Sequence, residues 1–339
     1  MSNKMIRDVQ RKVTASDVAA RAGVSKWTVS RAFVEGASIS PDSLQRVLKA
    51  AEELGYRPNL LARSLSKKRT NIVGVVMDEF TNPNVLEVLD EVSRQLQRKG
   101  YSTMLLNINA QLNYKPALLL ADQFQVDGVI FLGTSLPDEL LHLIQDIRHI
   151  PLIVLYRNST LPGIQVVNTD DFDGGEQLAG VLLQQGYQRM GYMAGPPSGS
   201  TRLERINGFS HRLAQAGLQV EQVLEAGSYL RQRGYEAMTA YLQVTEEAQW
   251  LDALFCENDN LALGALDALR AAGCEGRIAV VGFDGTELGS SPSYNLTTYR
   301  QPFEQLTAEA IRQLEQAEPQ GGQFLAKGEL VIRSSHLKR

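Results

Sequence analysis

The segment 25–31 concentrates hydrogen-bond donors and one large aromatic side chain on the outer face of a short predicted helix. These side chains are Ser25, Lys26, Trp27, Thr28, Ser30 and Arg31. Arg31 can pair with the edge of a guanine base, and Lys26 can do likewise or hold a phosphate. Trp27 can offer apolar surface to a thymine methyl group or cover the DNA backbone. The hydroxyl side chains suit phosphate contacts, which fix register without reading sequence. The pattern therefore indicates a helix that lies in a DNA major groove.

Two short helices joined by a tight turn would position this face. Thr14 is a good N-cap for the first helix, and Asp17 can return the bond three residues later. Gly23 supplies the turn, and Ser25 caps the second helix. The residues expected in the core between the helices are Val18, Ala19, Ala22, Val24 and Val29. Turn, caps and exposed base-reading side chains together outweigh the alternative of a generic helical bundle with a basic face.

A third helix is marked from Ser40 to Gly55. Ser40 is a good N-cap, Pro41 fits the first helical position, and Asp42 favours the positive end of the helix. Apolar residues then recur at helical spacing, at Leu44, Val47, Leu48, Ala51 and Leu54. Three short helices bury little surface, so this unit must be small.

Charge separates this unit from the rest of the chain. Residues 1–70 hold 14 Lys and Arg against 6 Asp and Glu, which is a net charge of +8. The whole chain has a net charge of −4, so residues 71–339 carry −12. A basic head on an acidic body fits a polyanion that binds at one end only.

The stretch 56–70 can begin a helix at Asn59, but this helix is too short to be stable alone in water. Here the sequence resembles a known family. Segments 23–31 (GVSKWTVSR) and 56–65 (YRPNLLARSL) are similar to the DNA-binding region and hinge of the lactose/galactose-repressor (LacI/GalR) family of bacterial transcriptional regulators. The chain departs from that family at Val34, where an asparagine is usual, so one polar contact to DNA loses its usual side chain.

The resemblance implies particular roles in DNA binding. Lys26, Trp27 and Arg31 occupy the family's base-reading positions. In the family, two hinge helices insert a leucine pair into the minor groove and kink the site; by position that leucine is Leu65, with Ala62 beside it. The full set of expected DNA-binding residues is Ser25, Lys26, Trp27, Thr28, Ser30, Arg31, Asn59, Ala62 and Leu65.

The remainder of the chain alternates apolar strand-like runs with amphipathic helices. The predicted strands are 72–77, 104–106, 128–132, 152–155, 165–167, 190–194, 253–256 and 279–283. The predicted helices are 85–99, 174–185, 201–216 and 259–272. Fully apolar strands between amphipathic helices predict parallel sheets covered on both faces, and about 270 residues suit two lobes better than one.

This body resembles the effector domain of the same family, which is in turn similar to periplasmic sugar-binding proteins. The matching segments are 195–197, 205–209, 258–265, 280–284 and 296–302. The resemblance spans residue 13 to about residue 334, and it implies an all-α helix-turn-helix headpiece followed by a two-lobed α/β effector domain with parallel sheets.

The expected division of the chain has three parts. A helix-turn-helix domain covers 13–57, a hinge segment covers 58–70, and an effector-binding and dimerisation body covers 71–339. Within the body, the N-terminal lobe is expected at about 71–167 with 303–327, and the C-terminal lobe at about 168–302 with 328–339.

Two facing lobes form a cleft beyond the carboxyl ends of their strands, and parallel sheets bind ligands there. The resemblance makes Arg205, Asn258 and Asp284 the best candidates for polar ligand contacts. A carboxylate and a guanidinium can each take two adjacent hydroxyls of a polyol, and an aromatic ring can cover an apolar sugar face. The full set of expected effector-binding residues is Asp78, Phe80, Arg205, Tyr229, Asn258, Asp284 and Gln301.

Other interpretations of these side chains stay open. Asp284 could cap the turn that follows it, Arg205 could form a surface ion pair, and Tyr229 could be structural. Arg157, next to Tyr156, leaves an anionic sugar open as the ligand.

Catalysis finds little support in the sequence. The histidines are His142, His149, His211 and His336. They lack metal-ligand spacing, and no nucleotide-binding loop or nucleophile elbow is present. Cys256 and Cys274 fit structural thiols in a reducing cytoplasm. The N-terminus has no apolar core of a signal peptide. No apolar run approaches the ~20 residues that a membrane span needs. We therefore expect no cofactor, metal or membrane partner.

Two alternative functions compete with DNA-binding regulation. One is a small-molecule-binding protein that merely carries a basic head, which the chemistry of segment 25–31 argues against. The other is a two-lobed enzyme that acts on sugars, which turnover of a sugar panel would reveal.

The combined expectation is a ligand-gated transcription regulator in the cytoplasm. A homodimer would place two recognition helices in successive major grooves of a near-palindromic operator. The resemblance implies a repressor of carbohydrate-use genes that is released by a sugar, sugar phosphate or sugar acid. No leucine heptad follows residue 334, so dimers are expected rather than tetramers joined by a C-terminal coil.

Overall fold

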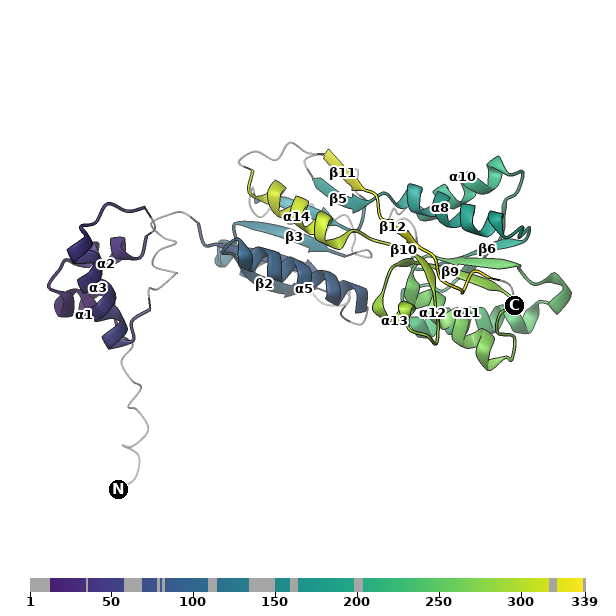
Figure 1. Cartoon of the computed structure of the whole chain (residues 1–339), viewed down its shortest axis with the longest axis horizontal. Helices are drawn as coiled ribbons and strands as arrows, with labels where there is room; N and C mark the ends of the chain where they lie inside the picture. The colour runs from purple at the N-terminus through teal and green to yellow at the C-terminus, as the bar shows by residue number, and fades with distance from the viewer. Residues whose placement is uncertain are drawn as a thin grey trace, which may run out of the picture. The chain divides into compact units, whose positions relative to one another are not determined.

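The structure is a computed structural model that describes residues 13–34, 36–57, 69–77, 80, 83–108, 115–133, 150–158, 164–197, 204–316 and 322–337. Contacts within the chain group it into two units, Met1–Thr70 and Asn71–Arg339. Each unit has its own hydrophobic core. Figure 1 labels many of the helices and strands of both units.

The described helices of the first unit are α1 (Ala15–Ala22), α2 (Lys26–Ala32) and α3 (Pro41–Leu54). The start of α1 is the predicted one, because the Asp17 carboxylate accepts hydrogen bonds from the Thr14 backbone nitrogen at 2.8 Å and from the Thr14 hydroxyl at 2.7 Å. After α1 the chain turns at Gly23, whose φ of +65° is a left-handed conformation that suits glycine.

Serine side chains cap the two remaining helices of this unit. The Ser25 hydroxyl accepts a hydrogen bond from the Thr28 backbone nitrogen at 3.1 Å, and the Ser40 hydroxyl accepts one from the Ser43 nitrogen at 3.3 Å. Each cap satisfies one amide that the first turn of a helix would otherwise leave without a partner. The caps therefore fix where α2 and α3 begin.

Small side chains form most of the core between these helices. The buried residues are Val18, Ala19, Ala22, Val29, Val47, Ala50 and Ala51. The Arg46 guanidinium also donates to the Ala22 carbonyl at 3.2 Å and ties α3 to α1. Leu48, which belongs to the apolar repeat of α3, is exposed. The buried face of α3 is formed by Val47, Ala50 and Ala51.

The second unit contains two six-stranded sheets, and the first is parallel throughout, in the order β11-β5-β4-β3-β1-β2. Its strands are β1 (Ile72–Met77), β2 (Ser102–Asn107), β3 (Gly128–Leu132), β4 (Leu152–Leu155), β5 (Gln165–Thr169) and β11 (Gly322–Ala326). In register, Val75 of β1 pairs with Leu105 of β2 and Ile130 of β3.

Helices cover both faces of this first sheet. One face packs on α5 (Pro83–Arg98) and α14 (Phe303–Leu314), and the other packs on α6 (Lys115–Gln123). Because successive residues of a strand point to opposite faces, the strands had to be apolar on both sides, which is why they could be recognised in the sequence.

The second sheet has the order β12-β10-β9-β8-β6-β7, and only β12 runs antiparallel to its neighbour. Its strands are β6 (Met190–Ala194), β7 (Val220–Glu225), β8 (Ala253–Cys256), β9 (Ala279–Asp284), β10 (Thr297–Arg300) and β12 (Glu329–Val331). One face packs on α8 (Asp171–Gln184) and α10 (Arg205–Gln215). The other packs on α11 (Arg231–Val244) and α12 (Asp259–Ala271). Two short helices are η1 (Glu247–Gln249) and α13 (Glu287–Ser290).

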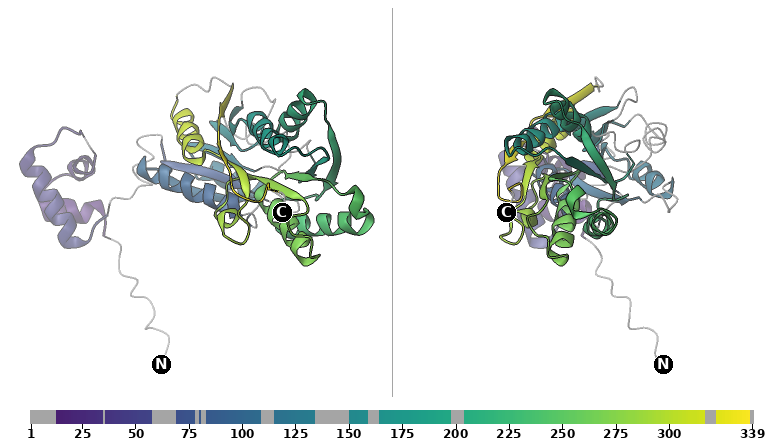
Figure 2. Two further views of the ribbon diagram at one scale, coloured as in Figure 1. Left: turned by 45° about the vertical axis from the view of Figure 1, so that its right-hand side comes forward. Right: turned by 90° about the vertical axis from the view of Figure 1, so that its right-hand side faces the viewer.

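The chain passes between the sheets at three points in the described residues, after β5, after β10 and between β11 and β12. Side chains tie these crossings together. The Tyr299 hydroxyl donates to Asp173 at 2.9 Å and accepts from the Gly328 backbone nitrogen at 2.8 Å. Lys327 pairs with the same carboxylate at 2.6 Å. The turned view in the left part of Figure 2 shows the elements of the body that these crossings connect.

The predicted fold class is confirmed: a helix-turn-helix unit is followed by a two-lobed α/β body with parallel sheets covered by helices. Several elements had no counterpart in the sequence prediction, namely α6, α11, α14, β7, β10, β11 and β12. Three of these strands, β7, β11 and β12, lie at sheet edges, where one side meets solvent and apolar runs are not required.

Candidate DNA-reading face and ligand cleft

The outer face of α2 presents the side chains expected to read DNA. Lys26, Trp27 and Ser30 are exposed, whereas Val29 on the opposite side is fully buried. Trp27 is 66% exposed, although tryptophan side chains are highly buried on average. The face therefore combines hydrogen-bond donors with an exposed aromatic ring, which suits a helix that lies in a major groove.

Arg31 does not extend freely into solvent. Its guanidinium carbon lies 4.2 Å from the centroid of the Trp27 ring, one helical turn earlier on the same face. Such a cation–π contact is attractive because the face of the ring is negative. The two side chains that carry most of the reading chemistry thus contact each other.

Four of the expected site residues lie outside the described residues: Asn59, Ala62 and Leu65 of the hinge, and Asp78 after β1. Their roles stay predictions. Phe80 is half-buried and packs against the core of the first sheet. It does not line the cleft described below, so its contact with an effector also stays a prediction.

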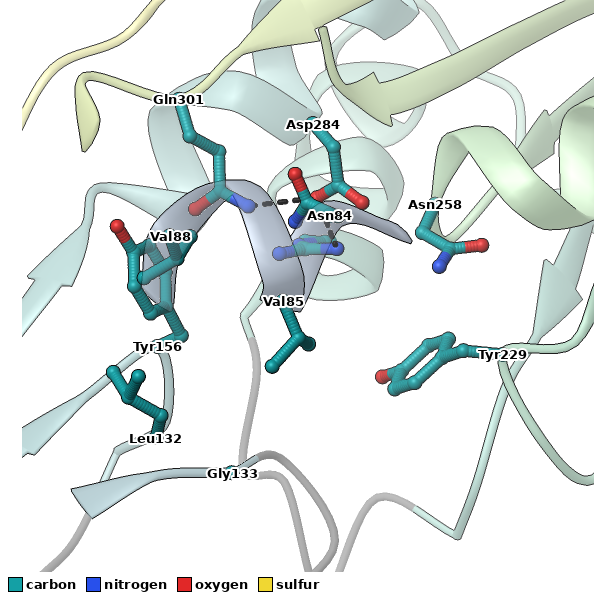
Figure 3. Close-up of a pocket in the computed structure, with 11 residues that line it drawn as sticks. Asn84, Val85, Val88, Leu132, Gly133, Tyr156, Tyr229, Asn258, Asp284 and Gln301 are labelled. Carbon is teal, nitrogen blue, oxygen red and sulfur yellow. Dashed lines mark hydrogen bonds and ion pairs between the residues drawn. The ribbon is translucent and has the colours of Figure 1, made fainter. Parts of the chain in front are cut away.

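A cleft of about 40 Å³ lies in the body, at the ends of strands of both sheets (Figure 3). It brings together five of the predicted effector residues. The whole lining is Asn84, Val85, Val88, Leu132, Gly133, Tyr156, Arg205, Tyr229, Asn258, Asp284 and Gln301. In Figure 3 the Asn258 amide and the Tyr229 ring lie opposite Leu132 and Tyr156. One wall is therefore polar and the other mainly apolar.

Arg205 is the first residue of α10 and is almost completely buried. Its Nε donates to Asp171 at 3.0 Å, and its Nη1 donates to the Glu257 carbonyl at 2.6 Å. The same Nη1 lies 3.9 Å from Asp284, and the guanidinium carbon lies 3.8 Å from the centroid of the Phe283 ring. Burial lowers the pKa of Arg205, but the charges of Asp171 and Asp284 raise it above the ordinary value. Arg205 is thus a buried, charged ion-pair partner rather than a surface one.

Asp284 ends β9 with a φ of +126°, a backbone conformation that residues other than glycine rarely adopt. The Gln301 amide donates to its carboxylate at 2.7 Å. Burial raises the pKa of Asp284 to about 8; Arg205 lowers it, and the neighbouring Asp259 raises it further. The strained backbone aims this carboxyl at the cleft.

The alternative role of Asp284, capping the following turn, is filled by Asp259 instead. The Asp259 carboxylate accepts hydrogen bonds from the backbone nitrogens of Gly285 at 3.0 Å and Thr286 at 2.7 Å, and from the Thr298 hydroxyl at 2.6 Å. Burial raises the pKa of Asp259 to about 6, although these donors lower it. Asp259 therefore caps the turn, and the Asp284 carboxyl lines the cleft.

Asn258 and Gln301 each combine a structural bond with a place in the cleft. The Asn258 side-chain oxygen accepts from the Leu261 nitrogen at 2.9 Å and caps α12. The Gln301 oxygen accepts from the Thr169 hydroxyl at 2.7 Å, so Gln301 joins two of the crossings between lobes while its nitrogen holds Asp284. A ligand that contacts Gln301 would contact the connection between lobes directly.

Tyr156 lines the apolar wall in a left-handed conformation, with φ of +62°. Its ring meets the edge of Phe303 with centroids 5.7 Å apart. Burial raises the pKa of Tyr156 well above the ordinary value, and its buried hydroxyl has no hydrogen-bond partner among the described residues. The hydroxyl is thus a polar group available to a ligand.

Sequence reasoning missed Glu257 and the first turns of α5. Glu257 is buried behind the polar wall, accepts a hydrogen bond from the Gly195 nitrogen, and has a pKa raised by burial. The ring of Tyr229 crosses Gly195 so closely that a Cβ there would lie 2.3 Å from it. Asn84 and Val85 follow β1, so the rule that ligands bind beyond the carboxyl ends of strands could have indicated them. No sequence signal marked Glu257.

Two family models match the chain. Residues 14–59 match the model for "Bacterial regulatory proteins, lacI family", and residues 70–294 match the model for "Periplasmic binding proteins and sugar binding domain of LacI family".

Relatives of known function match over most of their length. The HTH-type transcriptional repressor PurR of Proteus mirabilis (strain HI4320) is 31% identical over 306 residues, which cover 89% of this chain and 89% of that protein. PurR of Photobacterium profundum is 28% identical over 331 residues, covering 95% of this chain and 98% of that protein.

Solved structures match in fold over nearly the whole chain. The Lac repressor dimer bound to operator and the anti-inducer ONPF superposes with a TM-score of 0.85 at 27% identity, covering 96% of this chain and 100% of that chain. The transcriptional regulator CelR in its cellobiose complex superposes with a TM-score of 0.70 at 28% identity, with the same coverage. None of the described helices combines the length and apolar character that a membrane span requires.

Proposed function

The chain belongs to the LacI family of bacterial regulatory proteins and is a ligand-responsive transcriptional repressor rather than an enzyme; from this premise we propose that its effector is a sugar and its targets are carbohydrate-use genes. The observation that carries the proposal is the cleft in which Arg205, Asn258 and Asp284 converge opposite an apolar wall. The solved relative that holds cellobiose supports the same class of ligand.

The polar wall suits hydroxyl groups in adjacent positions on a ring. A carboxyl group and an amide accept and donate hydrogen bonds side by side, and the Tyr229 ring can cover an apolar sugar face. On the other wall, Val85, Val88 and Leu132 offer apolar contact. A ligand with a hydroxyl-rich edge and an apolar face uses both walls.

The charges around the cleft favour an uncharged sugar over a sugar phosphate or sugar acid. The Arg205 guanidinium is already paired with the Asp171 carboxylate, the Asp284 carboxyl lies near the same group, and the Glu257 backbone carbonyl accepts a hydrogen bond from it. A phosphate or carboxylate placed among these carboxyls would have to displace an existing buried pair, which costs desolvation energy without a new cation.

The DNA-bound assembly that we propose is a homodimer on a near-palindromic operator. Candidate dimer contacts are the exposed apolar side chains on α6, on the turn that follows it and on the edge strand β2, namely Leu105, Leu119, Leu120 and Phe124. In this assembly the hinge segment 58–70 would contact the DNA, with Leu65 inserted into the minor groove. Such a protein acts where the operator is, in the cytoplasm.

Effector control then requires that the sugar binds one arrangement of the lobes better than another. Gln301 supports this coupling because it contacts both the Asp284 carboxylate and Thr169 at a crossing between lobes. We propose that the sugar releases the operator, so that repression ends when the sugar is present.

The test is footprinting of the purified protein on the DNA upstream of its own gene and neighbouring genes, at fixed salt, with and without a panel of sugars, sugar acids and sugar phosphates. We expect protection of a short palindrome that an uncharged sugar weakens. Protection that responds only to a sugar acid or phosphate, or to no sugar at all, would overturn the proposed effector class.

A further inference from the structure

The recognition helix carries one feature that the family assignment does not explain, the contact between Trp27 and Arg31. The two residues are four apart, so they lie on the same face of α2. The guanidinium carbon stands 4.2 Å from the indole centroid, yet the ring itself is 66% exposed. The indole therefore covers the Arg31 guanidinium rather than the core of the headpiece.

The other contacts of Arg31 leave this ring as its main support. The Nε atom of Arg31 is buried and has no hydrogen-bond partner among the described residues. An arginine side chain carries considerable rotamer freedom, and its donors lie in one plane. A ring that holds one face of this plane removes rotamers while it leaves the outer edge of the guanidinium free for a base.

We propose that Trp27 acts on DNA through Arg31: its ring positions the guanidinium over the one base pair that Arg31 reads, so that specificity at that base pair belongs to both residues. Trp27 is then a positioning residue and not a direct contact to a thymine methyl group or to the backbone. The inference rests on the proposed role of α2 as the DNA-reading helix and adds how its main donor is aimed.

The contact also predicts which substitutions conserve the function. Phenylalanine keeps an aromatic face at position 27, whereas alanine removes it, and neither change opens the core because the ring is exposed. Loss of an exposed cation–π contact changes an equilibrium constant by a few-fold. We therefore expect about a two- to fivefold loss of discrimination at one base pair in the alanine variant.

The experiment is selection of bound sequences from a randomised DNA pool with the full-length protein, followed by affinity measurements on single-base variants of the selected site. The proteins compared are the wild type, Trp27→Ala, Trp27→Phe, Arg31→Ala and the double alanine variant. Lys26→Ala is the matched control on the same helix, since it removes a donor at the adjacent position, and adjacent residues of a helix do not face each other.

The proposal predicts one affected position. Trp27→Ala relaxes the same base pair as Arg31→Ala, Trp27→Phe retains most of that preference, and the double variant relaxes it no further than Arg31→Ala does. Lys26→Ala changes affinity without relaxing that base pair.

Two results would overturn the proposal. Relaxation of a different base pair in Trp27→Ala would mean that the indole reads DNA itself, and equal weakening on every sequence would mean that it only contacts the backbone. If the wild type selects no sequence, the proposed DNA-reading role of α2 is wrong. If the wild type selects a site normally and Trp27→Ala is unaffected, only the positioning role of Trp27 is wrong.

Discussion

Arg31 on the recognition helix and Arg205 in the cleft carry the same guanidinium group in opposite surroundings. Arg31 is half-buried and rests on an exposed indole ring, whereas Arg205 is buried and bound to Asp171 and to the Glu257 carbonyl. DNA brings its own negative charge, so the first site needs only aimed donors. A small ligand brings little charge, so the second site must neutralise its own. Substitution of Arg31 should therefore change DNA binding without changing the stability of the fold. Substitution of Arg205 should change both ligand binding and the stability of the fold.

The largest effect should follow Arg205→Ala. The change leaves Asp171 and Asp284 buried beside no cation, and breaking a buried pair from one side costs about 3–5 kcal/mol of folding free energy. Denaturant unfolding of the body measures it. The control is Arg277→Ala, which removes an exposed pair with Glu247 and should change stability little. Equal costs for the two variants would contradict the contrast between buried and exposed arginines.

Asp284→Asn should remove the effector response while DNA binding persists. The amide keeps the shape of the side chain but changes its pattern of hydrogen-bond donors and acceptors, and a buried ligand group left without its partner costs about 1–3 kcal/mol of effector affinity. Operator affinity with and without the effector measures the loss, with Glu329→Gln on the exposed surface as the control. A variant that still responds at the ordinary effector concentration would place the ligand elsewhere.

The same variant tests the electrostatics of the cleft. The pKa of Asp284 in the folded protein is raised from 3.8 to about 8, so the folded state holds a proton that the unfolded chain releases between these values. Stability from this group is therefore fullest below pH 3.8 and declines as pH rises towards 8. The difference in unfolding free energy between the wild type and Asp284→Asn should fall over that window. A difference that rises with pH would mean that Arg205 lowers the pKa of Asp284 by more than burial raises it.

Arg31→Ala should weaken operator binding by about 1–3 kcal/mol and relax one base pair, with unfolding unchanged. The reason is that Arg31 contributes to no core and to no buried ion pair in the described residues. Competition binding on single-base variants of the operator measures it. Loss of headpiece stability in this variant would show that Arg31 is structural.

The smallest effect should follow Ser25→Ala. The hydroxyl caps α2 by accepting from the Thr28 nitrogen, and loss of such a cap costs about 1 kcal/mol. Thermal unfolding of the full chain, followed through the helices of the headpiece, measures this cost. Threonine at the same position should restore the cap; a threonine variant no better than alanine would show that the cap is not the cause.

Features of the fold that follow local sequence rules could be predicted from the sequence. The caps at Asp17, Ser25 and Ser40 and the strands of both sheet centres follow local rules, and the structure contains them. The positions of Arg205, Asn258 and Asp284 followed from a family resemblance, and the structure places them around one cleft.

Other features depend on contacts between distant segments and left no local pattern. Glu257 lies behind the cleft because Gly195 donates to it, and Asp259 rather than Asp284 holds the turn at Gly285. The buried face of α3 depends on how α3 packs against α1. Edge strands such as β7 need no apolar face.

The coupling between the cleft and the operator is tested most directly by the affinity of the purified protein for its selected operator, measured at fixed salt with and without each compound of the sugar panel, in the wild type and in Asp284→Asn. We expect at least one uncharged sugar to lower the affinity of the wild type about 5- to 150-fold and to leave that of the variant unchanged. An operator affinity that no sugar alters, although sugar binding to the body is measured directly, would refute this coupling.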